Sequence, residues 1–157
     1  MTTSPLDASS YFKPRASSGI RCSVDTRSPE QRRRIMRAVR SKDTGPELLV
    51  RRLLHAMGYR YRLHRKTLPG KPDLVFPRSR KAVFVHGCFW HWHGCSKGQL
   101  PKSRQDYWEP KLRRNIARDL ENIAALEALG WHPLTVWQCE TKDVDALTER
   151  LVNFLES

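Results

Sequence analysis

Two kinds of apolar spacing run along this chain, and together they predict helices and strands from about residue 28 to the C-terminus. Apolar residues that recur every three to four positions are typical of amphipathic helices, whereas alternation or a short apolar run is typical of strands. Helical spacing is found at 44–57, from about 107 or 111 to 129, and at 146–155. Strand patterns occur at 59–63, 73–76, 82–85 and 131–137. Because one strand pair is joined by a helical crossover, the order predicts an α/β sandwich around a mixed sheet.

Capping signals mark the starts of two helices near the N-terminus. Ser28 suits an N-cap, Pro29 suits the first helical position, and Gln31 closes a capping box. The same kind of signature recurs at 44–47. The first of these helices is basic, with Arg32, Arg33, Arg34, Arg37, Arg40 and Lys42. This charge density favours a helix that lies along a DNA backbone over a solvated helix with a narrow docking stripe.

Length and composition predict one folded domain behind a tail. A chain of 157 residues is long enough for one domain with a core and too short for two. Residues 1–27 are rich in Ser, Thr, Pro and Arg, which predicts a disordered tail before a single domain over 28–157. The chain has neither an apolar run of about eighteen residues nor an apolar N-terminal region. We therefore expect no membrane span, no secretory signal and a cytoplasmic protein.

The charge balance points to a partner. Lys and Arg number 29 against 16 Asp and Glu, so the formal net charge is +13 at pH 7. Such an excess is informative about partners rather than about fold. Its simplest explanation is nucleic acid, because each neutralised phosphate releases a counterion. The alternative is a solvated surface in an arginine-rich proteome.

Three cysteines and a histidine form a candidate zinc site. Cys88, His93 and Cys95 lie close together in a segment with little core, and Cys139 arrives from the end of the last predicted strand. Three thiolates and one imidazole match a closed tetrahedral structural zinc site. Cys22, in the predicted tail, is a competing fourth ligand. Buried thiols without metal are the alternative, and a disulfide is disfavoured because no export signal is present.

A second set of residues is suited to hydrolysis. Asp73 heads an apolar strand, where it is either a turn residue or a hard oxygen ligand for Mg²⁺. His86 and His91 are either solvated or able to take a proton from water near neutral pH. Asp119 could orient one of these imidazoles. Glu47 could add a second carboxylate at the metal, although it also fits the capping signature.

Adjacent large aromatic residues lie in the same cysteine-containing segment. Phe89 and Trp90 are neighbours, and Trp92 follows. They either pack in the core or insert between base pairs, as wedge residues do when they kink a duplex. Met36, on the basic helix, is either a second wedge or a filler of a core gap.

Two segments, 68–73 and 85–95, resemble the very short patch repair (Vsr-type) DNA mismatch endonucleases. They read Leu-Pro-Gly-Lys-Pro-Asp and Val-His-Gly-Cys-Phe-Trp-His-Trp-His-Gly-Cys. Further matching residues are Met36-Arg37, Asp43-Thr44, Tyr107-Trp108, Asn115, Arg118-Asp119, 129–131 and 136–137. The match runs from about residue 28 to about 141. Its most specific part is Gly-Cys-Phe-Trp-His, because a zinc-spaced His and Cys follow it.

The resemblance implies a fold and a reaction. The fold is a restriction-endonuclease-like α/β core, a mixed sheet flanked by helices with a structural zinc site, which agrees with the predicted order of elements. The reaction is magnesium-dependent nicking of one strand, 5′ to the thymine of a T:G mismatch that arises when 5-methylcytosine deaminates, in very short patch repair. The implied partners of a monomeric chain are mismatched double-stranded DNA, a MutL-type repair protein and a cytosine methyltransferase.

The resemblance also implies roles for single residues. Asp73 matches a metal-binding aspartate, and Val85 falls where the backbone carbonyl is a second Mg²⁺ ligand and a threonine is common. His91 matches the general base, supported by a catalytic pair of His86 and Asp119. The implied zinc ligands are Cys88, His93, Cys95 and Cys139. The implied intercalating residues are Phe89, Trp90 and Met36.

Glu47 matches the family pattern, whereas Trp92 and Gly94 depart from it. Glu47 matches an acidic residue near the metals. Trp92 and Gly94 replace histidines that are often found in this run. Neither is an implied zinc ligand, so the departures bear only on local DNA contacts and sequence preference.

Two other functions fit parts of the same pattern. One is a nuclease of the same fold that acts on other DNA in a restriction setting. The other is a non-catalytic, zinc-stabilised DNA-binding module, which would leave Asp73 and His91 without a role.

Overall fold

A computed structural model describes residues 28, 30–31, 34, 42–101 and 104–157. The predicted tail over 1–27 with Cys22, the wedge candidate Met36 and most of the basic helix lie outside the described residues. The capping box at the start of that helix is confirmed. The backbone N–H of Ser28 donates to the Gln31 side chain at 3.0 Å, and the Gln31 N–H donates to Ser28 Oγ at 3.2 Å.

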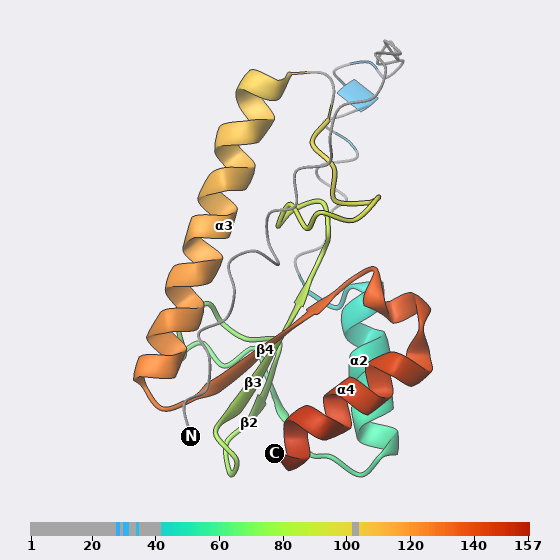
Figure 1. The fold of residues 1–157 in the computed structure, drawn as a ribbon, viewed down its shortest axis with the longest axis vertical. Coiled ribbons are helices and arrows are strands. Elements are labelled where there is room, and N and C mark those ends of the chain that lie inside the picture. The colour runs from blue at the N-terminus through green and yellow to red at the C-terminus, as the bar shows by residue number, and fades with distance from the viewer. Residues whose placement is uncertain (1–27, 29, 32–33, 35–41, 102–103) are drawn as a thin grey trace.

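A mixed four-stranded sheet forms the centre of the fold (Figure 1). Its strands are β1 (Arg62–Leu63), β2 (Leu74–Phe76), β3 (Lys81–His86) and β4 (His132–Trp137), in that spatial order. The first three strands pair antiparallel, whereas β3 and β4 are parallel. The crossover between β3 and β4 contains α3 (Gln105–Ala128), as the sequence predicted.

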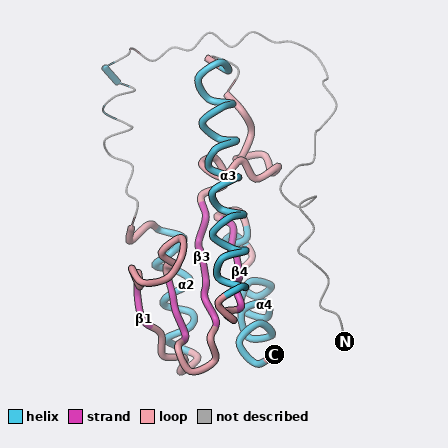
Figure 2. Tube along the Cα trace, turned by 90° about the vertical axis from the view of Figure 1, so that its left-hand side faces the viewer, coloured by secondary structure: helices cyan, strands magenta, loops and turns pink. Residues whose placement is uncertain are grey.

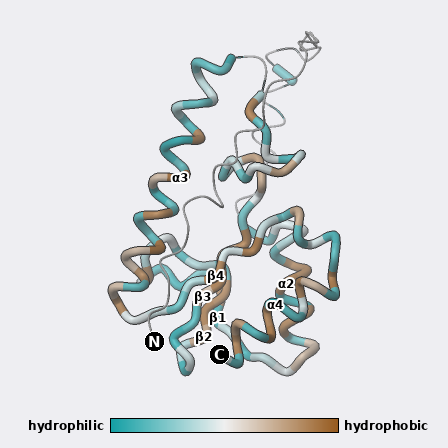
Figure 3. Tube along the Cα trace, in the orientation of Figure 1, coloured by the Kyte–Doolittle hydropathy of each residue, from teal (hydrophilic) through white to brown (hydrophobic). Residues whose placement is uncertain are grey.

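Helices cover both faces of the sheet (Figures 1 and 2). On one face, α2 (Gly45–Ala56) and α4 (Val144–Glu156) pack with the strands around a buried cluster of Val50, Leu54, Leu74, Phe76, Val83, Val136, Leu147 and Leu151. On the other face, α3 contributes to a cluster of Leu68, Val75, Ala82, Phe84, Leu126 and Trp131. Because strand side chains alternate between faces, β2 and β3 supply residues to both clusters, and these strands lie at the apolar centre in Figure 3.

One predicted strand is much shorter than its pattern indicated. Residues 59–63 alternate, but only Arg62 and Leu63 pair with β2. The Tyr59 N–H instead donates to the Leu54 carbonyl at 3.0 Å, and the Tyr61 hydroxyl donates to the Arg51 carbonyl at 3.0 Å. Both tyrosines therefore pack against α2 rather than extend the sheet.

The structure also adds detail around the ends of β4 and α3. A short 3-10 helix, η2 (Glu140–Lys142), which the sequence did not predict, links β4 to α4. The N-terminal half of α3 extends past the sheet beside the segment 87–101 (Figure 1). Within the described residues, no helix combines the length and apolarity needed to span a bilayer.

Candidate active site and metal centre

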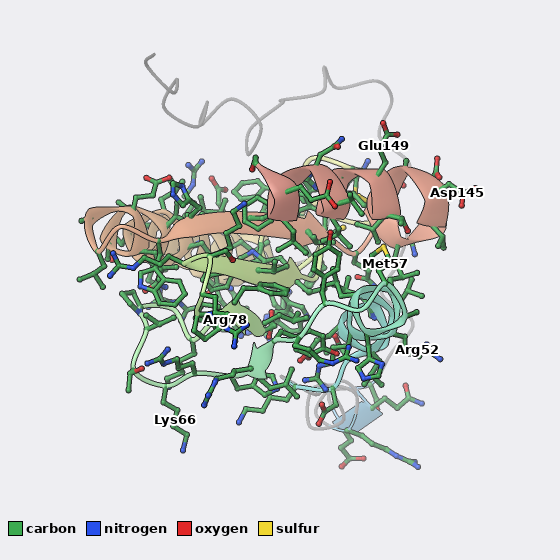
Figure 4. All side chains as sticks on the ribbon, turned by 90° about the horizontal axis from the view of Figure 1, so that it is seen from below. Arg52, Met57, Lys66, Arg78, Asp145 and Glu149 are labelled. Atoms are coloured by element: carbon green, nitrogen blue, oxygen red, sulfur yellow. The ribbon has the colours of Figure 1, made fainter. Side chains whose placement is uncertain are left out.

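One cleft of about 690 Å³ brings together residues that are far apart in the sequence. It lies where β2 begins, β3 ends and α3 passes over the sheet. Its walls include Asp73, Val85, His86, His91 and Asp119. Its rim is basic, with Lys42, Lys66, Lys71 and Arg118. Figure 4 shows Lys66 on the side of the molecule opposite to Asp145 and Glu149, which project from α4.

Asp73 is a partly buried carboxylate in this cleft. Its Oδ2 accepts a hydrogen bond from the Val85 N–H at 2.7 Å. Burial raises the pKa of Asp73 to about 6, and the charge of Glu47 acts in the same direction, while the Val85 hydrogen bond, Arg51 and His91 act against it. A carboxylate that is costly to ionise in the free protein is well placed to bind a cation, which would favour its charged form.

The carbonyl of Val85 points toward the same side as Asp73. Along β3, the carbonyls of Arg80 and His86 accept from the N–H groups of His132 and Gln138, so these carbonyls face β4. Since successive residues of a strand direct their N–H and C=O groups to opposite sides, both groups of Val85 face β2. A carboxylate and a carbonyl on one side of a cleft are the hard oxygen ligands that Mg²⁺ prefers.

The opposite wall holds two stacked imidazoles. The rings of His86 and His91 lie parallel, with centroids 3.7 Å apart and planes 6° apart. His91 Nδ1 is hydrogen-bonded to Asp119 Oδ2 on α3. Burial lowers the pKa of His86 to about 3, and the neighbouring His91 and Arg118 add to this effect against the opposing charge of Asp119. Because His86 is neutral, the stacked His91 ring can accept a proton without a second positive charge in contact with it.

Glu47 does not line the cleft, although it lies just behind it. It is 2% exposed on α2 and is ion-paired with Arg51. Its Oε1 is also 3.3 Å from Nε2 of His64, whose Nδ1 is 3.8 Å from Asp73 Oδ1. His64 therefore bridges the two carboxylates.

Sequence reasoning did not place Arg51 and His64 beside Glu47 and Asp73. The spacing of Glu47 and Arg51, four residues apart on one helix, is a readable signal for an ion pair. His64 gave no such signal. It follows the short β1 strand with a φ of 46°, and only the pairing of β1 with β2 carries it next to Asp73.

The cysteine and histidine ligands come together at the ends of β3 and β4. His86 and Trp137 are the last paired residues of these parallel strands, so Cys88 and Cys139 follow them at the same edge. One ligand atom from each of Cys88, His93, Cys95 and Cys139 lies within 4.8 Å of all the others.

The donor set of this group fits zinc. The Cys139 N–H donates to Cys88 Sγ at 3.3 Å, and the His93 ring stacks on Trp137 with centroids 4.3 Å apart. Burial raises the pKa of the Cys88 thiol to about 12. A bound cation would reverse that preference, because metal coordination deprotonates a thiol. Sulfur and imidazole ligands at this spacing are typical of tetrahedral zinc.

The aromatic residues pack on one another beside α3. Phe89 and Trp90 are half-buried and belong to neither of the two core clusters. Each lies near Trp108, with centroids 5.3 and 6.2 Å away, and Lys111 Nζ is 5.7 Å from the centroid of Trp90. Asn115 Nδ2 donates to the Trp90 carbonyl at 2.9 Å. Trp108 is thus a member of this group that sequence reasoning did not assign.

Comparison with known proteins decides the family. The family model for DNA mismatch endonuclease Vsr matches residues 24–97. The chain is 61% identical over 133 residues to the type II nicking enzyme V.XorIIP of Xanthomonas oryzae pv. oryzae, a match that covers 85% of this chain and 98% of the relative. The chain belongs to the Vsr family of DNA mismatch endonucleases.

Two further relatives agree with this assignment. The type II nicking enzyme V.NmeAIP of Neisseria meningitidis is 42% identical over 82% of this chain and 91% of the relative. The DNA mismatch endonuclease Vsr of Escherichia coli is 38% identical over 84% of this chain and 88% of the relative. The mixed sheet with helices on both faces is consistent with the nuclease fold of the Vsr family. Membership of this family also supports DNA as the partner of the chain.

Proposed function

We propose that this chain is a magnesium-dependent endonuclease that nicks one DNA strand 5′ to the thymine of a T:G mismatch arising from 5-methylcytosine deamination, in very short patch repair. The observation that carries the proposal is the single cleft lined by Asp73, Val85, His91 and Asp119. Membership of the Vsr family and the basic rim of the cleft support it.

Asp73 and the Val85 carbonyl would hold Mg²⁺ in this cleft. When bound, the ion would supply charge neutralisation at the phosphate and at the leaving 3′-oxygen. Glu47 contributes negative charge from behind the cleft through its contact with His64. Lys66, Lys71 and Arg118 fit a role in holding neighbouring phosphates.

His91 is the proposed general base. Its Nδ1 is bonded to Asp119, so Nε2 is the nitrogen that takes a proton from the attacking water. Asp119 orients the ring and stabilises the imidazolium that forms, while His86 stays neutral. The water oxygen bonds to phosphorus as the bond from phosphorus to the 3′-oxygen breaks. The departing 3′-oxygen takes a proton from solvent water, which leaves a 5′-phosphate and a 3′-hydroxyl.

Recognition of the mismatch is assigned to the aromatic residues. Phe89 and Trp90, with Met36 of the predicted basic helix, would enter the stack beside the mispair. Unstacking costs a few kcal/mol and less at a mismatch, which gives selectivity. Zinc on Cys88, His93, Cys95 and Cys139 would keep this segment in shape without taking part in the chemistry.

The proposed enzyme is one monomeric domain over 28–157. A MutL-type repair protein and a cytosine methyltransferase would be partners in the repair setting. Two relatives described as type II nicking enzymes favour a second setting, in which the chain accompanies a restriction system. The substrate separates these settings.

The test is end mapping of labelled T:G and matched T:A duplexes, with and without Mg²⁺. We expect the wild type to nick the T:G duplex alone, on the 5′ side of the thymine, and only with Mg²⁺. Asp73→Ala should abolish nicking, whereas Asp145→Ala, at an exposed acidic residue of α4, should not change it. Equal nicking by wild type and Asp73→Ala refutes the metal assignment. Cleavage of matched duplex favours the restriction setting, and a mobility shift without cutting favours a binding module.

A further inference from the structure

A third group of potential metal ligands adjoins the cleft, which His64 lines. Asp43, Glu47 and His64 each offer one ligand atom, and these atoms lie within 4.8 Å of one another. Two carboxylates and an imidazole are a donor set that can bind a divalent cation such as Mn²⁺. This group, here called the acidic cluster, is contributed by the start of α2 and the end of β1.

The acidic cluster already contains a cation that belongs to the protein. Arg51 Nη1 lies 2.6 Å from Asp43 Oδ1, while its Nη2 contacts Glu47 Oε1 and lies 2.9 Å from His64 Nε2. The guanidinium therefore touches all three members of the cluster at once. A guanidinium stays charged at every pH that the protein experiences, and its planar donors suit carboxylates.

Burial holds the guanidinium in this place. The Arg51 side chain is 12% exposed and the Glu47 side chain is 3% exposed. Arg51 Nε is buried and finds no hydrogen-bond partner among the described residues, so the polar contacts of the side chain are at its two outer nitrogens. The tip of Arg51 is therefore fixed by the cluster itself.

The acidic cluster also adjoins Asp73. The His64 N–H donates to the Asp73 carbonyl at 3.2 Å, and the His64 ring approaches the Asp73 carboxylate on one side and Glu47 on the other. A cation in the cluster would thus be a neighbour of the ion proposed at Asp73. The fold holds an arginine where a second metal ion would otherwise be attracted.

We propose that Arg51 is the built-in second cation of this active site, filling the acidic cluster so that the protein binds one divalent ion fewer than its carboxylates would otherwise hold. The inference deepens the proposed function and rests on it for the ion at Asp73. The position of Arg51 itself is independent of that role. The guanidinium cannot dissociate, and it cannot activate a bound water molecule as a metal ion does. Arg51 therefore contributes a fixed positive charge and no nucleophile.

The experiment counts Mn²⁺ ions on the full, zinc-loaded chain by electron paramagnetic resonance, without DNA. We expect Arg51→Ala to bind one more Mn²⁺ than the wild type. That additional ion should be lost when Glu47→Gln is combined with Arg51→Ala. Arg51→Lys, which keeps a positive charge, and Arg52→Ala, at an exposed neighbour on α2, should both retain the wild-type count.

Arg51→Ala leaves buried Glu47 without its partner and could destabilise the fold. A second variant and a second measurement therefore keep the inference testable. Arg51→Gln fills similar space without charge and should also gain the ion. Mn²⁺ should raise the melting temperature of both variants more than that of the wild type, because a ligand stabilises the state that binds it. Equal Mn²⁺ counts in the wild type and both variants overturn the inference, as does an additional ion that survives Glu47→Gln.

The proposed function fails by a different result. If Asp73→Ala keeps full nicking activity, the assignment of a metal ion to Asp73 is wrong. The difference in Mn²⁺ count between wild type and Arg51→Ala still reports on the acidic cluster alone.

Discussion

Two carboxylates flank Asp73, and the fold pairs them differently. Asp119, on α3, is bonded to the imidazole of His91, whereas Glu47, on α2, is bonded to the guanidinium of Arg51. An imidazole can gain and lose a proton near neutral pH, and a guanidinium cannot. The His91 side is therefore suited to moving a proton, and the Arg51 side is suited to holding charge.

The two sides also differ in what fixes them. Glu47 and Arg51 are on a helix whose Val50 and Leu54 are fully buried in the larger core cluster. His91 lies in the segment 87–101, whose Cys88, His93 and Cys95 form the candidate zinc site with Cys139 at the edge of the sheet. One side should therefore depend on the apolar core and the other on a metal.

The largest expected effect comes from a substitution at the candidate zinc site, which should disrupt the His91 side of the cleft alone. Cys95→Ala should lower the zinc content from about one ion per chain to near zero and reduce nicking of a T:G duplex by at least about 10²-fold, because His91 and the aromatic residues lose their support together. Unfolding in urea should stay cooperative, since the apolar core does not include this segment. Zinc analysis, a nicking assay and circular dichroism measure these outcomes. Ser96→Ala, at the exposed neighbour, is the control. Full activity without zinc would show that the segment holds its shape unaided.

Removing the imidazole tests proton transfer directly. His91→Gln should reduce the single-turnover nicking rate by about 10²- to 10⁴-fold, the range for a lost general base. Binding to the T:G duplex should change little, because the wedge and the basic rim stay in place. Exposed His132→Gln is the matched control. A decrease in binding equal to the decrease in rate would make His91 a contact residue instead.

The buried charge of Asp73 should appear in the pH dependence of stability. Its pKa of about 6 in the folded protein is above the ordinary value of 3.8, so this group contributes stability below about pH 3.8 that is lost as the pH rises through about 6. Without added Mg²⁺, Asp73→Asn should exceed the wild type at pH 8 by up to about 3 kcal/mol in free energy of unfolding, and most of this difference should be gone at pH 4. Urea unfolding at pH 4, 6 and 8 measures it, and a difference that is constant with pH contradicts the expectation.

The smallest effect concerns the two sides of the cleft as DNA contacts. Lys66, on the His64 side, and Arg118, on the His91 side, both line the cleft. Each alanine variant should reduce the slope of log affinity against log salt by about 0.9, the value for one phosphate contact. Lys142→Ala, at an exposed residue of η2, should leave the slope unchanged. A change in slope for only one of the two variants would show that the DNA backbone passes on a single side of Asp73.

The elements of the fold were predictable because their signals are local. The Thr44 N-cap accepts from the Glu47 N–H, and the apolar runs at 74–76 and 81–86 form strands, with boundaries close to those expected. The strand at 59–63 failed because its tyrosines pack on α2, a competing contact that the alternating pattern does not reveal.

By itself, the sequence determined the helices and strands, the family resemblance and the residue types that gather in the cleft and the cysteine cluster. Its dense motif at 85–95 held most of the chemistry within a short segment, where spacing is informative. Only the tertiary structure placed His64 between Glu47 and Asp73, put Arg51 in the acidic cluster and joined Trp108 to the aromatic group. These contacts depend on how α2, β1 and α3 pack on the sheet, and packing brings together residues whose separation along the chain carries no periodic signal.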